Sequence, residues 1–216
     1  MTASPHVRQI VLDLPALAPR MTRAALVVSA SNAGAIEMLD AWKVSDEAAL
    51  VICGPNGSGK THLLQMLTRE AAAAGEEIIA VDDIHLAAEP GDILALFERA
   101  RGESRRIVFA GRGGPSDWAN GLKDLETRLN AAARISMQEP DEALLRAVIL
   151  KLFRDRQLKA APTIVEFALR RLPKTFAAAQ AFVGALDAAS IEKAAPIGLK
   201  LAREVVANLS EEAWSA

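Results

Sequence analysis

The sequence has few of the features that mark a secreted or membrane protein. Cysteine occurs once, as Cys53, so no disulfide can form within the chain. The opening residues have no apolar signal core, and no run of about 20 apolar residues is present to span a membrane. We therefore expect a cytoplasmic protein without a membrane partner.

The sequence also has no large excess of positive or negative residues, and it has few aromatic residues. Lys and Arg number 25 and Asp and Glu 27, and the net charge of −2 gives no general attraction for nucleic-acid phosphates. The tryptophans are scattered at Trp42, Trp118 and Trp214 rather than grouped for stacking on bases. Direct sequence-specific DNA binding is therefore not predicted. Hydrophobic residues make up 51% of the 216 residues and alanine is abundant, which predicts a helix-rich globular protein.

One glycine-rich segment matches the Walker A pattern at every specified position. It consists of Gly54, Pro55, Asn56, Gly57, Ser58, Gly59, Lys60 and Thr61. An apolar, strand-like run precedes it and a helical pattern follows it, which is the context that the motif requires. The glycines let N–H groups converge on phosphate oxygens, Lys60 supplies a cation for the β and γ phosphates, and the Thr61 hydroxyl can ligate Mg²⁺. The segment predicts a site for ADP or ATP with Mg²⁺; the alternative is a glycine-rich turn that matches by accident.

An acid pair follows the next apolar run. Residues 78–81 have a strand-like pattern, and Asp82 and Asp83 come directly after them. In a Walker B element, Asp82 can hold magnesium through water, and Asp83 can orient or deprotonate the attacking water. The alternative is a solvated acidic turn after a strand.

Strand-like runs alternate with helical patterns as far as residue 140. We expect strands at 48–53, 78–81, 106–110 and 133–137, and helices at 33–42, 61–74 and 92–101. Ser31 and Asn32 offer an N-cap for the first helix. The alternation predicts an α/β fold with a parallel sheet, helices on its faces, and a ligand at the carboxyl ends of the strands.

After residue 140 the pattern is helical only. Helices are expected at 141–156, 162–172, 175–191 and 196–209. Near the N-terminus, Pro5, Pro15 and Pro19 discourage regular structure. We therefore expect an N-terminal arm at 1–23, a nucleotide-binding base at 24–140, and a small all-helical lid domain at 141–216.

The interval between Lys60 and Asp82 is short. It has room for one helix and one strand, whereas the crossover of a larger NTPase core would include another strand. We therefore expect a sheet of four strands, one core strand fewer than usual, with residues 78–81 at an edge. Because exposed edges attract partners, we expect the N-terminal arm, another segment of the chain or another molecule to cover it.

These motifs together resemble the AAA+ module of the DnaA-related ATPases of bacteria. The resemblance rests on both Walker elements, the helical lid, the segment Phe109 to Arg112 before Pro115, and the segment Asp124 to Leu129. Within this family the chain is most similar to the Hda-type regulatory inactivators of DnaA, through residues 26–32 and 152–158 and through the lack of a helix-turn-helix domain after the lid. The resemblance implies a P-loop AAA+ base with a parallel sheet and DnaA as a partner, and it is compatible with a homo-oligomer.

The N-terminal arm carries a hexapeptide similar to the clamp-binding motif of these inactivators, Gln-Leu-x-Leu-x-Leu. Its residues are Gln9, Ile10, Val11, Leu12, Asp13 and Leu14. In an extended arm, Gln9 can hydrogen-bond at the rim of a clamp pocket while Ile10, Leu12 and Leu14 bury apolar surface. The resemblance therefore implies the β sliding clamp of DNA polymerase as a partner. The alternative is that these apolar residues pack on the chain's own core.

The same resemblance places Arg128 at an arginine finger. Such a guanidinium is offered to the γ phosphate held by a neighbouring subunit, and it can accelerate hydrolysis in trans by roughly 1000-fold or more. The alternative is a structural ion pair with Asp124 or Glu126; Asp124 lies four positions earlier, close enough to pair along a helix.

Two positions depart from the family's pattern. Arg112 occupies the first sensor, where a small polar residue is usual, and Ala177 stands at the second sensor, where the family carries arginine. Arg171 and Lys174 are the nearby cations that could replace it. These departures predict slow intrinsic hydrolysis, and they suit a protein that holds ADP and acts on another protein's ATP.

The expected function is the restraint of replication initiation. A nucleotide-bound regulator would sit on the DNA-loaded sliding clamp and present Arg128 to ATP-bound DnaA. Two alternatives stay open, a self-contained AAA+ ATPase such as a helicase loader and a non-hydrolysing nucleotide-bound scaffold. Steady-state hydrolysis by the isolated protein distinguishes the first alternative, and stimulation of DnaA by an Arg128→Ala protein would favour the second.

Overall fold

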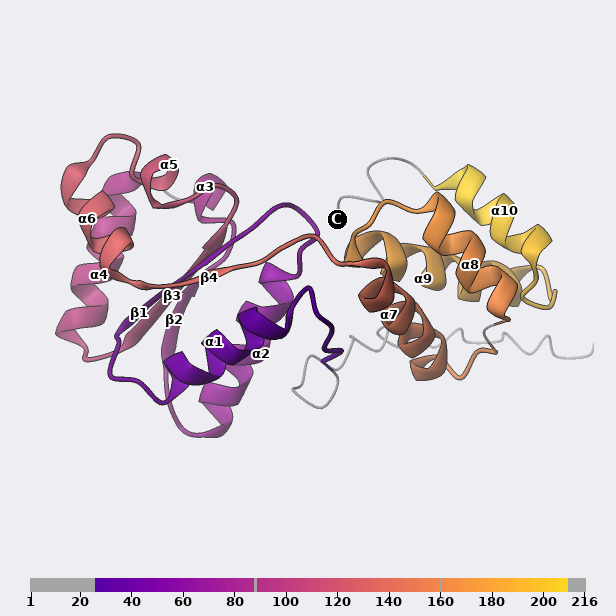
Figure 1. The fold of residues 1–216 in the computed structure, drawn as a ribbon, viewed down its shortest axis with the longest axis horizontal. Coiled ribbons are helices and arrows are strands. Elements are labelled where there is room, and N and C mark those ends of the chain that lie inside the picture. The colour runs from indigo at the N-terminus through magenta and orange to yellow at the C-terminus, as the bar shows by residue number, and fades with distance from the viewer. Residues whose placement is uncertain (1–25, 88, 160, 210–216) are drawn as a thin grey trace, which may run out of the picture.

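The computed structural model describes residues 26–87, 89–159 and 161–209, which form two lobes (Figure 1). The first lobe holds the strands β1 (Ala49–Cys53), β2 (Ile78–Val81), β3 (Arg106–Gly111) and β4 (Ala133–Ser136). Its helices are α1 (Ala33–Lys43), α2 (Lys60–Ala73), α3 (Ile84–Ala87), α4 (Pro90–Gly102), α5 (Pro115–Ala119) and α6 (Lys123–Ala131). The second lobe is helical and consists of α7 (Glu142–Asp155), α8 (Pro162–Arg171), α9 (Phe176–Glu192) and α10 (Leu199–Asn208).

The strands form one parallel sheet in the order β2-β3-β1-β4. The central strands β1 and β3 are buried along most of their length, whereas the edge strands β2 and β4 carry exposed residues. Strands covered on both faces have continuous apolar runs, and this explains the uninterrupted apolar sequences of β1 and β3. The α/β fold predicted from the sequence is confirmed.

The missing core strand is confirmed as well. Between Lys60 and Asp82 the chain forms α2 and β2 and no further strand. The sheet has four strands among the described residues, and β2 at its edge pairs only with β3. No described strand covers the outer side of β2.

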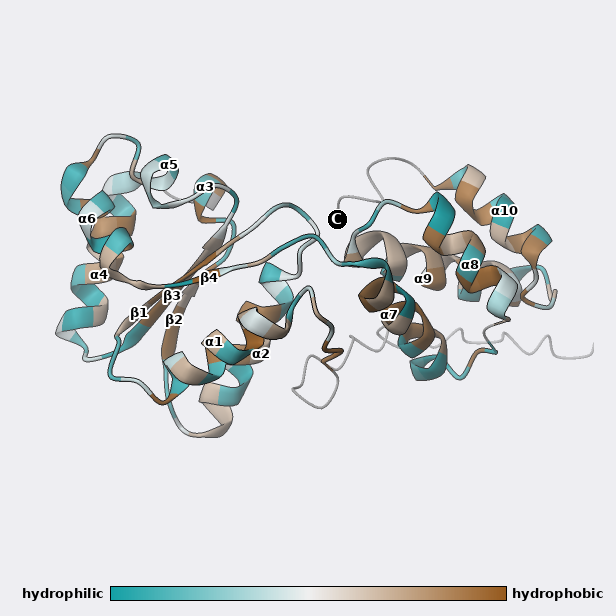
Figure 2. Cartoon of the chain, in the orientation of Figure 1, coloured by the Kyte–Doolittle hydropathy of each residue, from teal (hydrophilic) through white to brown (hydrophobic). Residues whose placement is uncertain are grey.

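Two apolar layers enclose the sheet. On one face, Leu39 of α1 and Met66 of α2 pack against the strands, and both side chains are fully buried. On the other face, Phe109 of β3 meets Trp118 of α5 and the apolar side of α4 and α6. Figure 2 shows the hydrophobic strands in brown between helices that carry hydrophilic residues in teal. This core holds the carboxyl ends of β1 and β3 in fixed positions.

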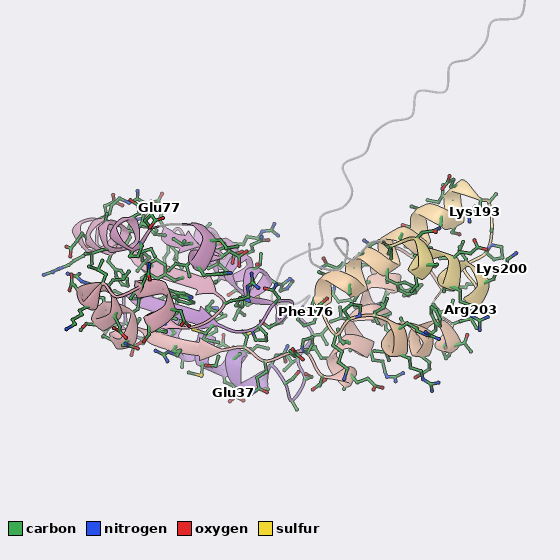
Figure 3. The ribbon with its side chains drawn as sticks, turned by 90° about the horizontal axis from the view of Figure 1, so that it is seen from above. Glu37, Glu77, Phe176, Lys193, Lys200 and Arg203 are labelled. Atoms are coloured by element: carbon green, nitrogen blue, oxygen red, sulfur yellow. The ribbon has the colours of Figure 1, made fainter. Side chains whose placement is uncertain are left out.

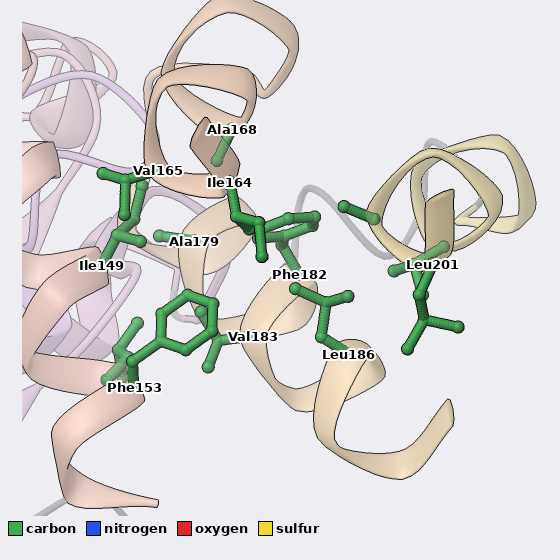
Figure 4. Close-up of a cluster of buried hydrophobic side chains, with 13 residues drawn as sticks. Ile149, Phe153, Ile164, Val165, Ala168, Ala179, Phe182, Val183, Leu186 and Leu201 are labelled. Carbon is green, nitrogen blue, oxygen red and sulfur yellow. The ribbon is translucent and has the colours of Figure 1, made fainter. Parts of the chain in front are cut away.

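The helical lobe packs around α9. Phe182 of α9 is fully buried among Phe153 of α7, Ile164 of α8 and Leu201 of α10 (Figure 4). The buried residues of α9 recur at helical spacing and include Ala178, Ala179, Phe182, Val183 and Leu186. This lobe therefore has a hydrophobic core of its own, separate from the layers around the sheet.

Polar residues anchor the connection between the lobes. Asp141 caps α7 by accepting a hydrogen bond from the Leu144 N–H at 2.6 Å, which lowers the pKa of this carboxyl, and it also accepts one from the Ser29 hydroxyl at 3.3 Å. Asn32 precedes α1, but the expected side-chain cap is wrong. Its side chain instead accepts from the Ser29 N–H and donates to the Val27 carbonyl, so it orders the loop before the helix.

Candidate nucleotide-binding site

The Walker A residues form the turn between β1 and α2 at the carboxyl end of the sheet. Gly57 and Gly59 have φ values of 70° and 92°, a region that glycine enters without strain. Helix α2 begins directly after this turn, so its free N–H groups and the positive end of its dipole face the same place. Converging N–H groups at a helix N-terminus form an anion site that fits phosphate.

Lys60 is the buried cation of this turn. Its residue is 6% exposed, and its Nζ donates a hydrogen bond to the Pro55 carbonyl at 2.8 Å. Burial lowers the pKa of Lys60, while the negative charges of Asp83 and Asp82 act against that shift. A buried ammonium group with one carbonyl partner is placed to bind an anionic oxygen.

A pocket of about 370 Å³ lies between the P-loop, α1 and the helical lobe. Its polar lining includes the P-loop and residues of both lobes, namely Asn56, Lys60, Thr61, His62, Asp83, Lys151 and Gln180. Its apolar lining includes Leu26, Val27, Ala35, Ile36, Leu63, Met137, Leu144, Val148, Leu152 and Phe176. Apolar walls with a few convergent polar groups fit a nucleotide, which has an apolar base and charged phosphates.

The acid pair is divided between two positions. Asp83 lines the pocket and has a φ of 45°, which is unusual for a residue other than glycine. Asp82 is not among the described residues that line the pocket, and its carboxylate accepts a hydrogen bond from the Asp83 N–H at 3.0 Å. Thr61 is in the pocket lining. No cluster of three or more His, Cys, Asp or Glu residues occurs in the described ranges, so Mg²⁺ at Thr61 and the acid pair would take further oxygens from phosphate and water.

The first residues of α9 lie directly on the P-loop. A Cβ atom placed on Gly57 would be 2.4 Å from the Thr175 Cβ, and one placed on Gly59 would be 2.9 Å from the Phe176 ring. Figure 3 shows Phe176 where the two lobes meet. Thr175 caps α9 by accepting from the Ala178 N–H. The N-terminus of a second helix therefore faces the pocket beside that of α2.

The lid side of the pocket has an alanine at the expected second-sensor position. Ala177 lines the pocket, and Gln180, one turn further along α9, lines it too. Arg171 and Lys174 are exposed and are not among the described residues that line it. No motif in the sequence pointed to Gln180, because only the packing of α9 on the P-loop turns this side chain toward the pocket.

His62 and Lys151 are two further lining residues that the sequence analysis did not assign to the site. Burial lowers the pKa of His62, and the charges of Lys151 and Arg69 lower it further. Lys151 also pairs with Asp155 along α7. A neutral His62 is therefore favoured near neutral pH.

Arg112, at the expected first sensor, contacts His85 rather than the pocket lining. Its backbone N–H lies 3.3 Å from His85 Nδ1, and its Nε lies 3.1 Å from His85 Nε2. A neutral imidazole has one acceptor nitrogen, so it can accept only one of these two bonds at a time. Arg112 is exposed beyond the end of β3.

Arg128 lies on α6 and is held by two carboxylates. Its Nη1 is 2.7 Å from Glu98 Oε1, and its Nε is 3.2 Å from Asp124 Oδ1. The hydrogen bond to Asp124 is the main cause that raises the pKa of Arg128. The ion pair with Asp124, which the sequence left open as the alternative to a finger role, is present, whereas Glu126 bonds to Ser116. Arg128 is not among the described residues that line the pocket.

The hexapeptide Gln9, Ile10, Val11, Leu12, Asp13 and Leu14 lies outside the described residues. Its role as a clamp-binding segment therefore stays a prediction from the sequence.

A parallel sheet, a P-loop with a buried lysine and a helical lobe on that loop define a nucleotide-binding P-loop protein. A family model described as ABC transporter matches residues 40–169, which is more than half of the chain. The chain belongs to this family of P-loop ATPases. No curated protein matches the sequence significantly.

Solved AAA+ structures share the fold at low sequence identity. Domain III of the replication initiation protein DnaA from Thermotoga maritima is 16% identical with a TM-score of 0.76, covering 91% of this chain and 99% of that one. AMPPCP-bound DnaA from Aquifex aeolicus is 16% identical with a TM-score of 0.66, covering 82% and 68%. The Thermotoga maritima branch migration motor RuvB is 14% identical with a TM-score of 0.62, covering 92% and 75%. None of the helices that the structure describes is long and apolar enough to cross a membrane.

Replacing the buried cation tests the site. Lys60→Ala removes a charge-assisted hydrogen bond to phosphate, worth about 1.5–3 kcal/mol, so ADP should bind about 10–100-fold more weakly. Isothermal titration calorimetry with Mg²⁺ measures this change. Lys43→Ala is the matched control, because Lys43 pairs with Glu70 at 2.6 Å on the surface of the base. An unchanged affinity in Lys60→Ala would refute the assignment.

The contact between α9 and the P-loop gives a second prediction. Gly57→Ala adds a Cβ at positive φ and against Thr175, and it should destabilise the protein by at least about 2 kcal/mol and weaken ADP binding. Gly34→Ala is the control, since a Cβ there has no neighbour within 4 Å. Thr175→Gly combined with Gly57→Ala should recover part of the loss. Additive costs, measured by denaturant unfolding, would show that the two residues do not touch.

Proposed function

We propose that this chain is an adenine-nucleotide-binding regulator of replication initiation that acts on DnaA. It binds ADP with Mg²⁺ in the pocket beside Lys60 and presents Arg128 to ATP held by DnaA. The observation that carries the proposal is the position of Arg128, half-buried on α6 and outside the lining of its own pocket. Its ion pairs with Glu98 and Asp124 would open when it reaches a phosphate. An arginine there would meet only the γ phosphate of another subunit, where it would stabilise the charge of phosphoryl transfer.

The lid supports ADP as the working ligand. Ala177 offers the pocket no charge, and Gln180 beside it is neutral. Lys151, the cation that the lid contributes to the lining, already pairs with Asp155. A γ phosphate would therefore find little positive charge on the lid side, which favours a diphosphate and slow turnover.

The division of labour in the proposal follows three segments. Residues 24–140 form the nucleotide-binding base, and residues 141–216 form the lid. Residues 1–23 are an arm that binds the sliding clamp through Gln9, Ile10, Leu12 and Leu14. A cytoplasmic complex on the clamp would bring Arg128 near DnaA at newly replicated DNA.

Arg128→Ala should abolish stimulation while leaving the protein's own ADP affinity unchanged. Hydrolysis by ATP-bound DnaA, measured with DNA-loaded clamp, should fall by up to about 1000-fold toward the basal rate of DnaA. The isolated wild-type protein should turn over ATP far more slowly than about 1 per second, an ordinary enzymatic rate.

Arg99→Ala is the matched control, because Arg99 is also exposed on the base and lies 4.0 Å from Glu103. Full stimulation by Arg128→Ala would favour a scaffold role instead. Turnover near about 1 per second by the isolated protein would favour a self-contained ATPase.

Clamp binding is tested separately. Gln9→Ala combined with Leu12→Ala should abolish capture on immobilised sliding clamp, because a polar anchor and an apolar anchor are removed together. ADP affinity should not change, since the arm and the P-loop are distinct sites. Val11→Ala with Asp13→Ala, at the unspecified positions of the motif, should still bind. Capture of the first double variant would assign the segment to the chain's own core.

A further inference from the structure

The outer side of β2 is an unprotected sheet edge. β2 (Ile78–Val81) pairs with β3 on one side, and no segment in the described part of the chain pairs with the other. Alternate N–H and C=O groups of a strand point to each side, so a row of backbone groups stays open. Proline and lysine, which commonly protect such edges, are absent from this strand.

The side chains of β2 leave the adjoining apolar layer unfinished. Ile78 packs against the α1–α2 layer but is only half-buried, and Ala80, which points to the same face, is exposed. Ile79 points to the opposite face and is buried. A further strand with apolar residues on the α2 face would complete this layer.

The N-terminal hexapeptide has the pattern of such a strand. Ile10, Leu12 and Leu14 alternate with Gln9, Val11 and Asp13, so three large apolar side chains share one face of an extended segment. The other face carries two polar residues, as expected for a half-covered edge.

The arm is long enough to reach β2. The described chain begins at Leu26, which packs with the α1–α2 layer and lines the pocket. Residues 15–25 can span up to about 36 Å when extended. A sheet of this size is only about 15 Å wide, at roughly 4.8 Å between neighbouring strands.

Charge favours one direction of pairing. Acidic residues flank β2. Glu77 is paired with Arg105 at 3.2 Å, whereas Asp82 forms no ion pair within the described ranges, although its charge acts on Lys60. An antiparallel arrangement brings Arg8 beside Asp82 and Asp13 beside the neutralised pair. A parallel arrangement with the same apolar face would put the acidic end of the hexapeptide next to Asp82, which is repulsive.

We propose that residues 9–14 add to β2 as an antiparallel fifth strand, and that this edge and the sliding clamp compete for the same hexapeptide. The competition with the clamp rests on the proposed function, whereas the addition of the fifth strand does not. A short tether gives the arm an effective concentration near the edge of roughly millimolar, so the clamp must displace it. In the free chain the hexapeptide and the outer edge of β2 therefore cover each other, and both become accessible when the clamp binds the hexapeptide.

Hydrogen–deuterium exchange of the full chain tests the strand without any partner. Ile10→Asp with Leu12→Asp breaks the apolar face of the arm, and those amides of residues 78–81 that face away from β3 should then exchange at least about 10-fold faster. Leu17→Asp with Met21→Asp adds the same charge to the arm outside the hexapeptide and should change nothing. The buried strand β1 serves as an internal reference.

Unchanged exchange at residues 78–81 in the first variant would overturn the proposal, as would equal acceleration in the control. Protection that rises with protein concentration would assign the edge to a second copy and would also overturn it. Addition of excess free clamp should expose residues 78–81. If the clamp binds while residues 78–81 stay protected from exchange, the competition is refuted. If protection depends on the arm but the clamp does not bind, only the proposed clamp binding is refuted, and the fifth strand stands.

Discussion

The backbone of Gly57 and Gly59 lies against Thr175 and Phe176 of the lid, and the arrangement of the whole pocket depends on this contact. A side chain on either glycine would hold α9 away from the phosphate-binding turn. With hydrogen in its place, two helix N-termini face one pocket and its apolar wall is drawn from both lobes. The residues that receive phosphate thus also position the lid.

The charges around the pocket follow from this packing. Lys60 is buried within the P-loop, and because its ammonium group has lost water, binding of an anion beside it is favourable. On the lid side, Ala177 near the start of α9 lines the pocket and carries no charge. The cation that the lid contributes, Lys151, is paired with Asp155, whereas Lys60 of the base donates to a carbonyl. This asymmetry is the physical basis of the proposed preference for a diphosphate.

Local patterns predicted most of this fold, because they act over short stretches of chain. Apolar runs marked β1 and β3, the glycines marked the P-loop, and the short spacing to Asp82 predicted the four-stranded sheet. The short helices α3, α5 and α6 were not among the expected helices, because short segments carry little periodic signal. Helix α10 begins at Leu199 rather than at residue 196. Contacts between distant segments, such as Arg128 with Glu98 or Gln180 in the pocket, depend on packing that no local pattern records.

The loop before α1 connects three parts of the molecule that are far apart in sequence. Leu26 and Val27 form part of the pocket wall, and Ser29 bonds to Asp141 where the lid begins. The N-terminal arm joins the chain at this point. A mechanical pull on the arm would therefore load the pocket wall first and the junction of the lobes next, before it reached the sheet. Tension on the arm would thus act first on the wall of the candidate nucleotide pocket.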